Sequence, residues 1–194
     1  MKLFHKVIAS IMLVAVSVSF VSAAPAPKDA KKQIPQGQYL TATEAYAKLK
    51  KDGNKILFID VRTPYEFQYV GSTPMVDKNI PIVTISLKKW DEKKKRYARI
   101  LNKNFVSEVE AALKAKGLTK KDKIVFMCRS GKRSIYTSKL MAKAGYMNVA
   151  TIVDGFEGGK DKKHKQRTTN SGWKNTCPAD SWGYKNHKEK MYFQ

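Results

Sequence analysis

Residues 123–134 read KIVFMCRSGKRS, and this stretch decides the fold. Its first part, KIVFM, is a short apolar run of the kind that forms a buried strand of a parallel sheet. Its second part, CRSGKRS, leads into a segment in which apolar residues recur at helical spacing until Gly145. The sequence therefore predicts a strand, a tight turn that carries Cys128, and a helix.

The same strand pattern occurs twice more. Residues 56–61 read ILFIDV and residues 149–153 read VATIV, each with an acid at or just after its end. A shorter strand is predicted around residues 79–81. Helices are predicted from the capping-box spacing of Thr41 and Glu44, and from an apolar face that begins at Phe105. Strands that alternate with helices predict an α/β domain with a mostly parallel sheet and helices on both faces.

Cys128 is the candidate nucleophile. Ligands of parallel sheets bind at the carboxyl ends of the strands, where this cysteine is expected. The turn can direct backbone N–H groups toward the sulfur, and the helix adds its positive end, so the thiolate is favoured without a histidine base. The alternative is that Cys128 has no chemical role and is a buried structural cysteine at the end of a core strand. The candidate substrate-binding residues are the rest of the turn: Arg129, Ser130, Gly131, Lys132, Arg133 and Ser134.

Three motifs carry a resemblance to a known family. IDVRTPYEF at 59–67, CRSGKRS at 128–134 and VDGFEG at 153–158 occur in the order of the rhodanese homology domain, which the chain resembles over about residues 39–159. This resemblance implies a five-stranded parallel sheet flanked by helices, and a Cys128 that cycles between thiolate and persulfide without a metal or an organic cofactor. It also implies that Asp60, Arg62 and Glu66 form the family's acid–arginine–acid set near the active-site entrance. From the residues alone, we favour an ion-pair network that braces the loop.

Loop length separates two chemistries of this fold. The related dual-specificity phosphatases carry five residues between cysteine and arginine, whereas four separate Cys128 from Arg133 here, which favours a single sulfur atom over a phosphate. We therefore expect a sulfurtransferase that moves sulfane sulfur from a small anionic donor, thiosulfate or polysulfide, to a thiol or to cyanide. Two alternatives stay open: a non-catalytic persulfide carrier or sulfur-binding module, and a redox protein that uses Cys128 together with Cys177.

The ends of the chain differ in composition from the middle. We expect a signal peptide over residues 1–23, a flexible lead-in over 24–37, the rhodanese-like domain over 38–159 and a basic C-terminal extension over 160–194. The apolar run of the signal is too short for a stable membrane span. The remaining chain has 36 basic and 16 acidic residues, a net charge of +20. Export to the periplasm then favours small anions and acidic proteins as partners over nucleic acid.

Overall fold

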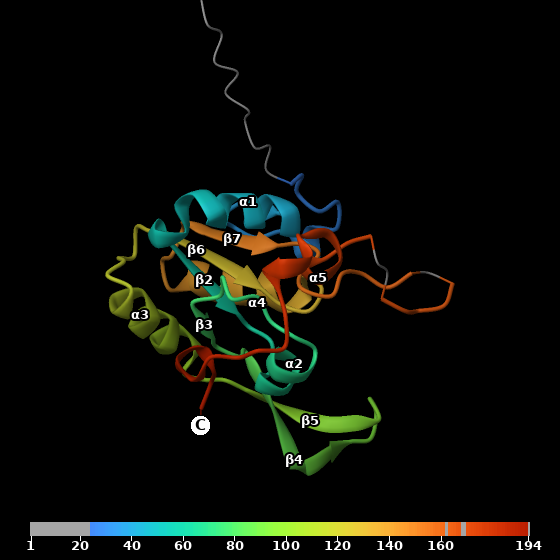
Figure 1. The fold of residues 1–194 in the computed structure, drawn as a ribbon. Helices are drawn as coiled ribbons and strands as arrows, with labels where there is room; N and C mark the ends of the chain where they lie inside the picture. Colours follow the sequence, from blue (N-terminus) through green and yellow to red (C-terminus); the bar gives the residue numbers. More distant parts are fainter. Residues whose placement is uncertain (1–23, 162, 168–169, 194) are drawn as a thin grey trace, which may run out of the picture.

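The central element is a five-stranded sheet with strand order β1-β7-β6-β2-β3, in which every pair of neighbours is parallel (Figure 1). The computed structural model describes residues 24–161, 163–167 and 170–193, so the signal peptide expected over 1–23 lies outside the described residues. The strands are β1 (Gln38–Leu40), β2 (Ile56–Asp60), β3 (Lys78–Asn79), β6 (Lys123–Met127) and β7 (Val149–Ile152). The predicted α/β class and the five parallel strands are confirmed.

Helices cover both faces of this sheet. The helices are α1 (Ala42–Asp52), α2 (Pro64–Tyr69), α3 (Phe105–Ala115), α4 (Lys132–Lys143) and α5 (Trp173–Thr176), with single 3-10 turns at Ala30–Lys32, Gly53–Lys55, Ala179–Ser181 and Lys188–Lys190. Phe58 of β2 packs into the core shared with α1, α2 and α5, and its neighbours Leu57 and Ile59 pack into the core shared with α3 and α4. This alternation is the period-two pattern of a strand that is buried on both faces.

Local sequence explains where the main elements begin. The Thr41 hydroxyl accepts a hydrogen bond from the Glu44 N–H at 3.2 Å, and the Glu44 carboxylate accepts one from the Thr41 N–H at 2.7 Å, which forms the predicted capping box of α1. Strand β6 covers the residues predicted for it. Thr63 and Glu66 cap α2 in the same way, and this short helix was not predicted.

A two-stranded antiparallel hairpin lies outside the main sheet. Strands β4 (Val83–Asp91) and β5 (Arg96–Leu101) pair with each other and extend away from the body of the domain (Figure 1). No helix or strand was predicted for this segment, which is rich in lysine and arginine. The hairpin escaped prediction because most of its side chains are exposed on both faces, which removes the burial alternation that marks a strand.

The expected lead-in packs on the domain. The Ala24 N–H donates to the carbonyl oxygen of Tyr39 at 3.1 Å, and the Ile34 N–H donates to the Tyr39 hydroxyl at 2.7 Å. Ala24 and Ile34 are buried in a small cluster with Tyr39 and Ile135 of α4. Two apolar side chains are thus enough to hold a segment that is otherwise polar and proline-rich.

The C-terminal extension also contributes to the core. Trp173 is fully buried against Phe58, with ring centroids 5.5 Å apart. Farther along, Ser72 and Gly183 exchange two backbone hydrogen bonds of 2.8 Å. The extension is therefore part of the folded domain. In the described part of the chain, no helix is both long and apolar enough to cross a membrane.

Candidate active site

Cys128 directly follows β6 and is only 1% exposed. The turn after it ends at Gly131, which has a φ of +83° and is the residue before α4. A Cβ atom at Gly131 would collide with the carbonyl oxygen of Val153. Only glycine fits this left-handed position against neighbouring backbone. In the described structure no side chain caps α4, so the N–H groups of its first turn face the loop region without a side-chain partner.

The third motif, at 153–158, holds the cysteine loop in place. The Phe156 N–H donates to the Cys128 carbonyl oxygen at 2.8 Å, and the Glu157 N–H donates to the Arg129 carbonyl oxygen at 2.9 Å. A side chain at Gly155 would overlap the backbone of Cys128 and Ser130. The motif therefore works as a clamp made of backbone, which fixes where the sulfur lies.

The Cys128 thiol donates a hydrogen bond to the hydroxyl of Ser134, with 3.7 Å between sulfur and oxygen. The Ser134 hydroxyl donates to the Gly131 carbonyl oxygen at 2.9 Å and accepts from the Thr151 hydroxyl at 2.7 Å. Both hydroxyl residues are fully buried. By rotating away from Gly131, the Ser134 hydroxyl can donate to a sulfur anion, while Thr151 keeps its oxygen in place.

The sequence predicts that Cys128 forms a persulfide, and a Ser134→Ala variant is expected to slow that predicted step. A hydrogen bond to a charged group contributes about 1.5–3 kcal/mol, which corresponds to a loss of roughly tenfold to a hundredfold. Single-turnover loading of Cys128 would measure it. Ser138→Ala is the matched control, because Ser138 is equally buried on α4 but bonds the Ser134 carbonyl oxygen instead of the sulfur. Equal losses in both variants would contradict a role for Ser134 at the sulfur.

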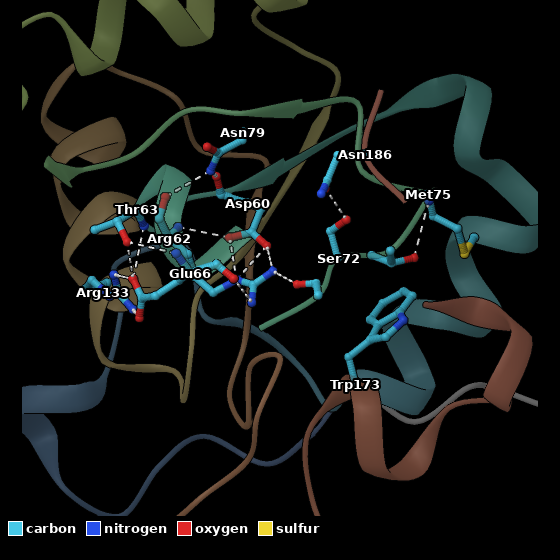
Figure 2. Close-up of polar contacts among 12 residues, drawn as sticks. Asp60, Arg62, Thr63, Glu66, Ser72, Met75, Asn79, Arg133, Trp173 and Asn186 are labelled. Atoms are coloured by element: carbon cyan, nitrogen blue, oxygen red, sulfur yellow. Dashed lines mark hydrogen bonds and ion pairs between the residues drawn. The ribbon is translucent and has the colours of Figure 1, made fainter. Parts of the chain in front are cut away.

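Asp60 and Arg62 form a fully buried ion pair behind the loop (Figure 2). The Arg62 Nε donates to both carboxylate oxygens, at 3.1 and 2.8 Å, and one terminal nitrogen donates to the Gly71 carbonyl oxygen at 2.9 Å. The guanidinium carbon lies 4.0 Å from the ring centre of Phe156 in the clamp. Both side chains are 0% exposed, so they brace the loop from within.

Glu66 and Arg133 form a second pair that links α2 to α4. The two terminal nitrogens of Arg133 donate to the two Glu66 oxygens, each at 2.6 Å, and Thr63 donates through its N–H and its hydroxyl (Figure 2). Burial alone would raise the pKa of Glu66, but the hydrogen bonds and charge of Arg133 together with Thr63 lower it to about 2. The guanidinium of Arg133 is thus turned toward Glu66. The sequence had suggested instead that Arg133 binds the substrate directly.

Stability is expected to fall in acid because of Glu66. Its pKa is lower in the folded chain than the usual 4.5, so its stabilisation is fully present above pH 4.5 and is lost as the pH falls toward about 2. The depression corresponds to a free energy on the order of 3 kcal/mol. Denaturant unfolding at pH 3 and pH 7 should show a smaller difference for Glu66→Gln than for the wild type. Glu92→Gln, which breaks an exposed pair with Lys95, should keep the wild-type difference.

Of the three cations predicted to bind substrate, Arg129 and Lys132 are not held by a hydrogen bond to Glu66 as Arg133 is. The Arg129 side chain is 41% exposed, and its Nε lies 4.0 Å from Glu66 without a hydrogen bond. Lys132 is exposed at the start of α4, and Ser130 is half-buried between the two. The structure therefore divides the predicted set: Gly131, Ser134 and Arg133 shape the loop, and Arg129, Ser130 and Lys132 border it.

The sequence analysis did not predict several of the residues that build the site. The Asn79 side-chain nitrogen donates to the carbonyl oxygens of Asp60 and Arg62, both at 2.9 Å, and ties the end of β2 to β3. Thr63, Thr151 and Gly155 were missed as well. The capping-box spacing of Thr63 and Glu66 was a usable signal for the first of these. Asn79 and Thr151 are brought to the site by strand pairing, for which one sequence carries no local sign.

A separate cavity of about 670 Å³ lies between α3 and the C-terminal segment. It is lined mainly by α3, by residues near β3 and by residues 189–193. None of the predicted site residues lines it.

The fold and this loop define a rhodanese-like α/β domain, and comparison with known proteins gives the same class. The family model "Rhodanese-like domain" matches residues 41–162. The chain therefore belongs to the rhodanese-like family.

The relatives are of two kinds. The uncharacterized protein RP600 of Rickettsia prowazekii is 36% identical over 130 residues, which is 66% of this chain and 92% of that protein. An adenylyltransferase and sulfurtransferase of Zea mays, MOCS3-2, is 28% identical over 124 residues, which is 64% of this chain but only 21% of that protein. The crystal structure of Rv0390 from M. tuberculosis has a TM-score of 0.54 at 23% identity, covering 76% of this chain and 97% of that one, and supports the fold.

Proposed function

We propose that the chain is a sulfurtransferase that carries sulfane sulfur on Cys128. The observation that carries this proposal is the loop itself: a cysteine at the end of β6, held by the backbone clamp of residues 153–158, beside the Ser134 hydroxyl and the exposed cations Arg129 and Lys132. Membership of the rhodanese-like family supports a sulfur-related role.

The proposed reaction has two displacements on sulfur. The Cys128 thiolate attacks the outer sulfur of thiosulfate, a new S–S bond forms, the S–S bond of the donor breaks, and sulfite leaves with the electron pair. The charge of the persulfide sulfur then faces the first turn of α4 and the Ser134 hydroxyl. Cyanide or a thiolate attacks that outer sulfur, which regenerates the Cys128 thiolate. Polysulfide as the donor follows the same steps, with a shortened polysulfide leaving.

Turnover is the decisive test. Thiosulfate or polysulfide is mixed with cyanide and catalytic amounts of protein, and thiocyanate is measured over time. Many equivalents of thiocyanate per Cys128 support an enzyme. A single equivalent, with persulfide visible by mass spectrometry, overturns the enzyme in favour of a persulfide carrier. Absence of both products with either donor rejects sulfur transfer.

A redox function that pairs Cys128 with Cys177 has less support. Both thiols are free, and they pack into different cores: Cys128 into the core with α3 and α4, and Cys177 against the core with α1 and α5. Burial, followed by the charge of Asp154, raises the pKa of Cys177 to about 11. A thiol that stays protonated is a poor partner in thiol–disulfide exchange.

We also propose that this reaction takes place outside the cytoplasm, in the periplasm. The support is the sequence of residues 1–23, with two lysines before an apolar run and small residues at its end. N-terminal sequencing of protein recovered from the periplasmic fraction should begin at Ala24. An N-terminus at Met1 in that fraction would contradict cleavage.

A further inference from the structure

The hairpin β4–β5 carries more charge than its own acids can balance. Its two acids, Asp91 and Glu92, are already paired with Lys94 and Lys95 at 3.8 and 3.1 Å. The basic residues of the hairpin are Lys88, Lys89, Lys93, Lys94, Lys95, Arg96 and Arg99. They lie on both strands and on the turn between them, and the hairpin extends away from the body of the domain (Figure 1). Cations at the turn of the hairpin do not contact a small anion that is bound at Cys128.

Large apolar side chains are exposed between these cations. Trp90 and Tyr97 are 50% and 49% exposed and contact each other edge to face, with centroids 5.5 Å apart. Leu87 and Ile100 are 65% and 51% exposed. Tryptophan, tyrosine and arginine are the residues that dominate the energy of protein–protein interfaces. The composition of the hairpin is that of a contact surface for a macromolecule.

The base of the hairpin lies beside α2, the helix that is paired with the active-site loop. Burial, followed by the charges of Arg96 and Arg133 and more weakly of Arg129, lowers the pKa of Arg99. Arg96 and Arg129 each bury an Nε atom that has no hydrogen-bond partner within the described residues. Glu66, whose two oxygens accept hydrogen bonds from Arg133, offsets part of this positive charge. Arg99 pairs with Ile85, which lines a hollow together with α2, the helix whose Glu66 holds Arg133. Cations therefore run along the hairpin from its turn toward the helix that is paired with the Cys128 loop.

We propose that the β4–β5 hairpin is a docking arm for an acidic protein that presents a thiol to Cys128. This inference rests on the proposed sulfur transfer. The position of the arm beside the helix that is paired with the loop favours a partner that takes part in the reaction, which a lipid surface cannot do. Cys128 is 1% exposed, so the partner presents its cysteine on an extended segment. The partner thiolate attacks the outer sulfur of the Cys128 persulfide, a new S–S bond forms on the partner, and the Cys128 thiolate leaves with the electron pair.

Two synthetic peptides test the arm. One carries a single cysteine among glutamates, and the other has glutamine in place of every glutamate. After loading of Cys128 with thiosulfate or polysulfide, the wild type should transfer sulfur to the glutamate peptide at least about tenfold faster at low salt, and the preference should shrink as salt rises. Lys88→Gln/Lys89→Gln/Lys93→Gln should lower this ratio by roughly threefold or more, because three of the seven hairpin cations are removed.

Lys50→Gln/Lys51→Gln/Lys55→Gln is the matched control, since these lysines are exposed near α1 and their loss changes the net charge equally. It should keep the preference. Equal rates for both peptides in the wild type, or equal loss in both triple variants, would overturn the docking arm while leaving cyanide turnover as separate evidence on the proposed function.

Binding can be read without sulfur chemistry. A fluorescent glutamate peptide with serine in place of cysteine should bind the wild type more tightly than the hairpin triple variant by anisotropy, even if Cys128 fails to load. Sedimentation with vesicles of phosphatidylglycerol and phosphatidylcholine tests whether the hairpin binds a membrane surface instead of a protein. Vesicle binding that needs the hairpin lysines, without any preference for the glutamate peptide, would assign the arm to a membrane and overturn the proposal.

Discussion

A Cys128→Ser variant is expected to lose sulfur transfer down to the background of the assay while keeping its fold. The proposed mechanism places every covalent step on this one sulfur, and a serine hydroxyl is neither ionised at neutral pH nor able to form a persulfide. Serine fits the site because its hydroxyl can make the hydrogen bond to Ser134 that the thiol makes. The measurements are thiocyanate formation for activity, and circular dichroism with thermal unfolding for the fold.

The control for this variant is Cys177→Ser. Cys177 packs against the core on the other side of the sheet, so its replacement should change stability slightly and leave most of the turnover. Full turnover in Cys128→Ser would refute the assignment of the nucleophile. Loss of turnover in both variants, with disulfide-linked protein under oxidising conditions, would instead favour the redox function.

The sequence predicts those parts of the fold whose environment is uniform. Strands β2, β6 and β7 are buried on both faces, and continuous apolar runs in the sequence predict them. The hairpin shows the opposite case, because exposed lysines on a strand look the same as lysines on any solvated segment. The position at which Trp173 is buried could not be predicted either, because it depends on a contact with Phe58, which is far away in the sequence.

The candidate site divides in the same way. Cys128 and its loop could be found from sequence because a turn with glycine at a fixed position has a local signature, and Gly131 does adopt the left-handed backbone. The role of Arg133 could not be predicted from the sequence. Its partner Glu66 lies 67 positions away in sequence, and a cation near a nucleophile reads as a substrate ligand until that partner is seen. Charge alone therefore overstates how many groups remain to bind a donor.

The largest loss of stability is expected from Asp60→Asn. This change leaves the fully buried Arg62 cation without a counter-charge, and breaking a buried pair in this way costs about 3–5 kcal/mol. For a domain of this size the midpoint of thermal unfolding should fall by about 10 °C or more. Denaturant and thermal unfolding would measure both quantities.

Two further variants separate the charge from the packing. Asp60→Leu combined with Arg62→Met removes both charges together and should recover part of the loss, because no buried ion then remains unpaired. Glu92→Gln breaks a pair whose two side chains are each 78% exposed, and it should leave the midpoint of unfolding unchanged. If Asp60→Asn were as stable as Glu92→Gln, Arg62 would have to reach another counter-charge or solvent in solution. The brace behind the Cys128 loop would then rest on the Phe156 contact and on the hydrogen bonds of Arg62 to the Gly71 and Glu66 carbonyl oxygens.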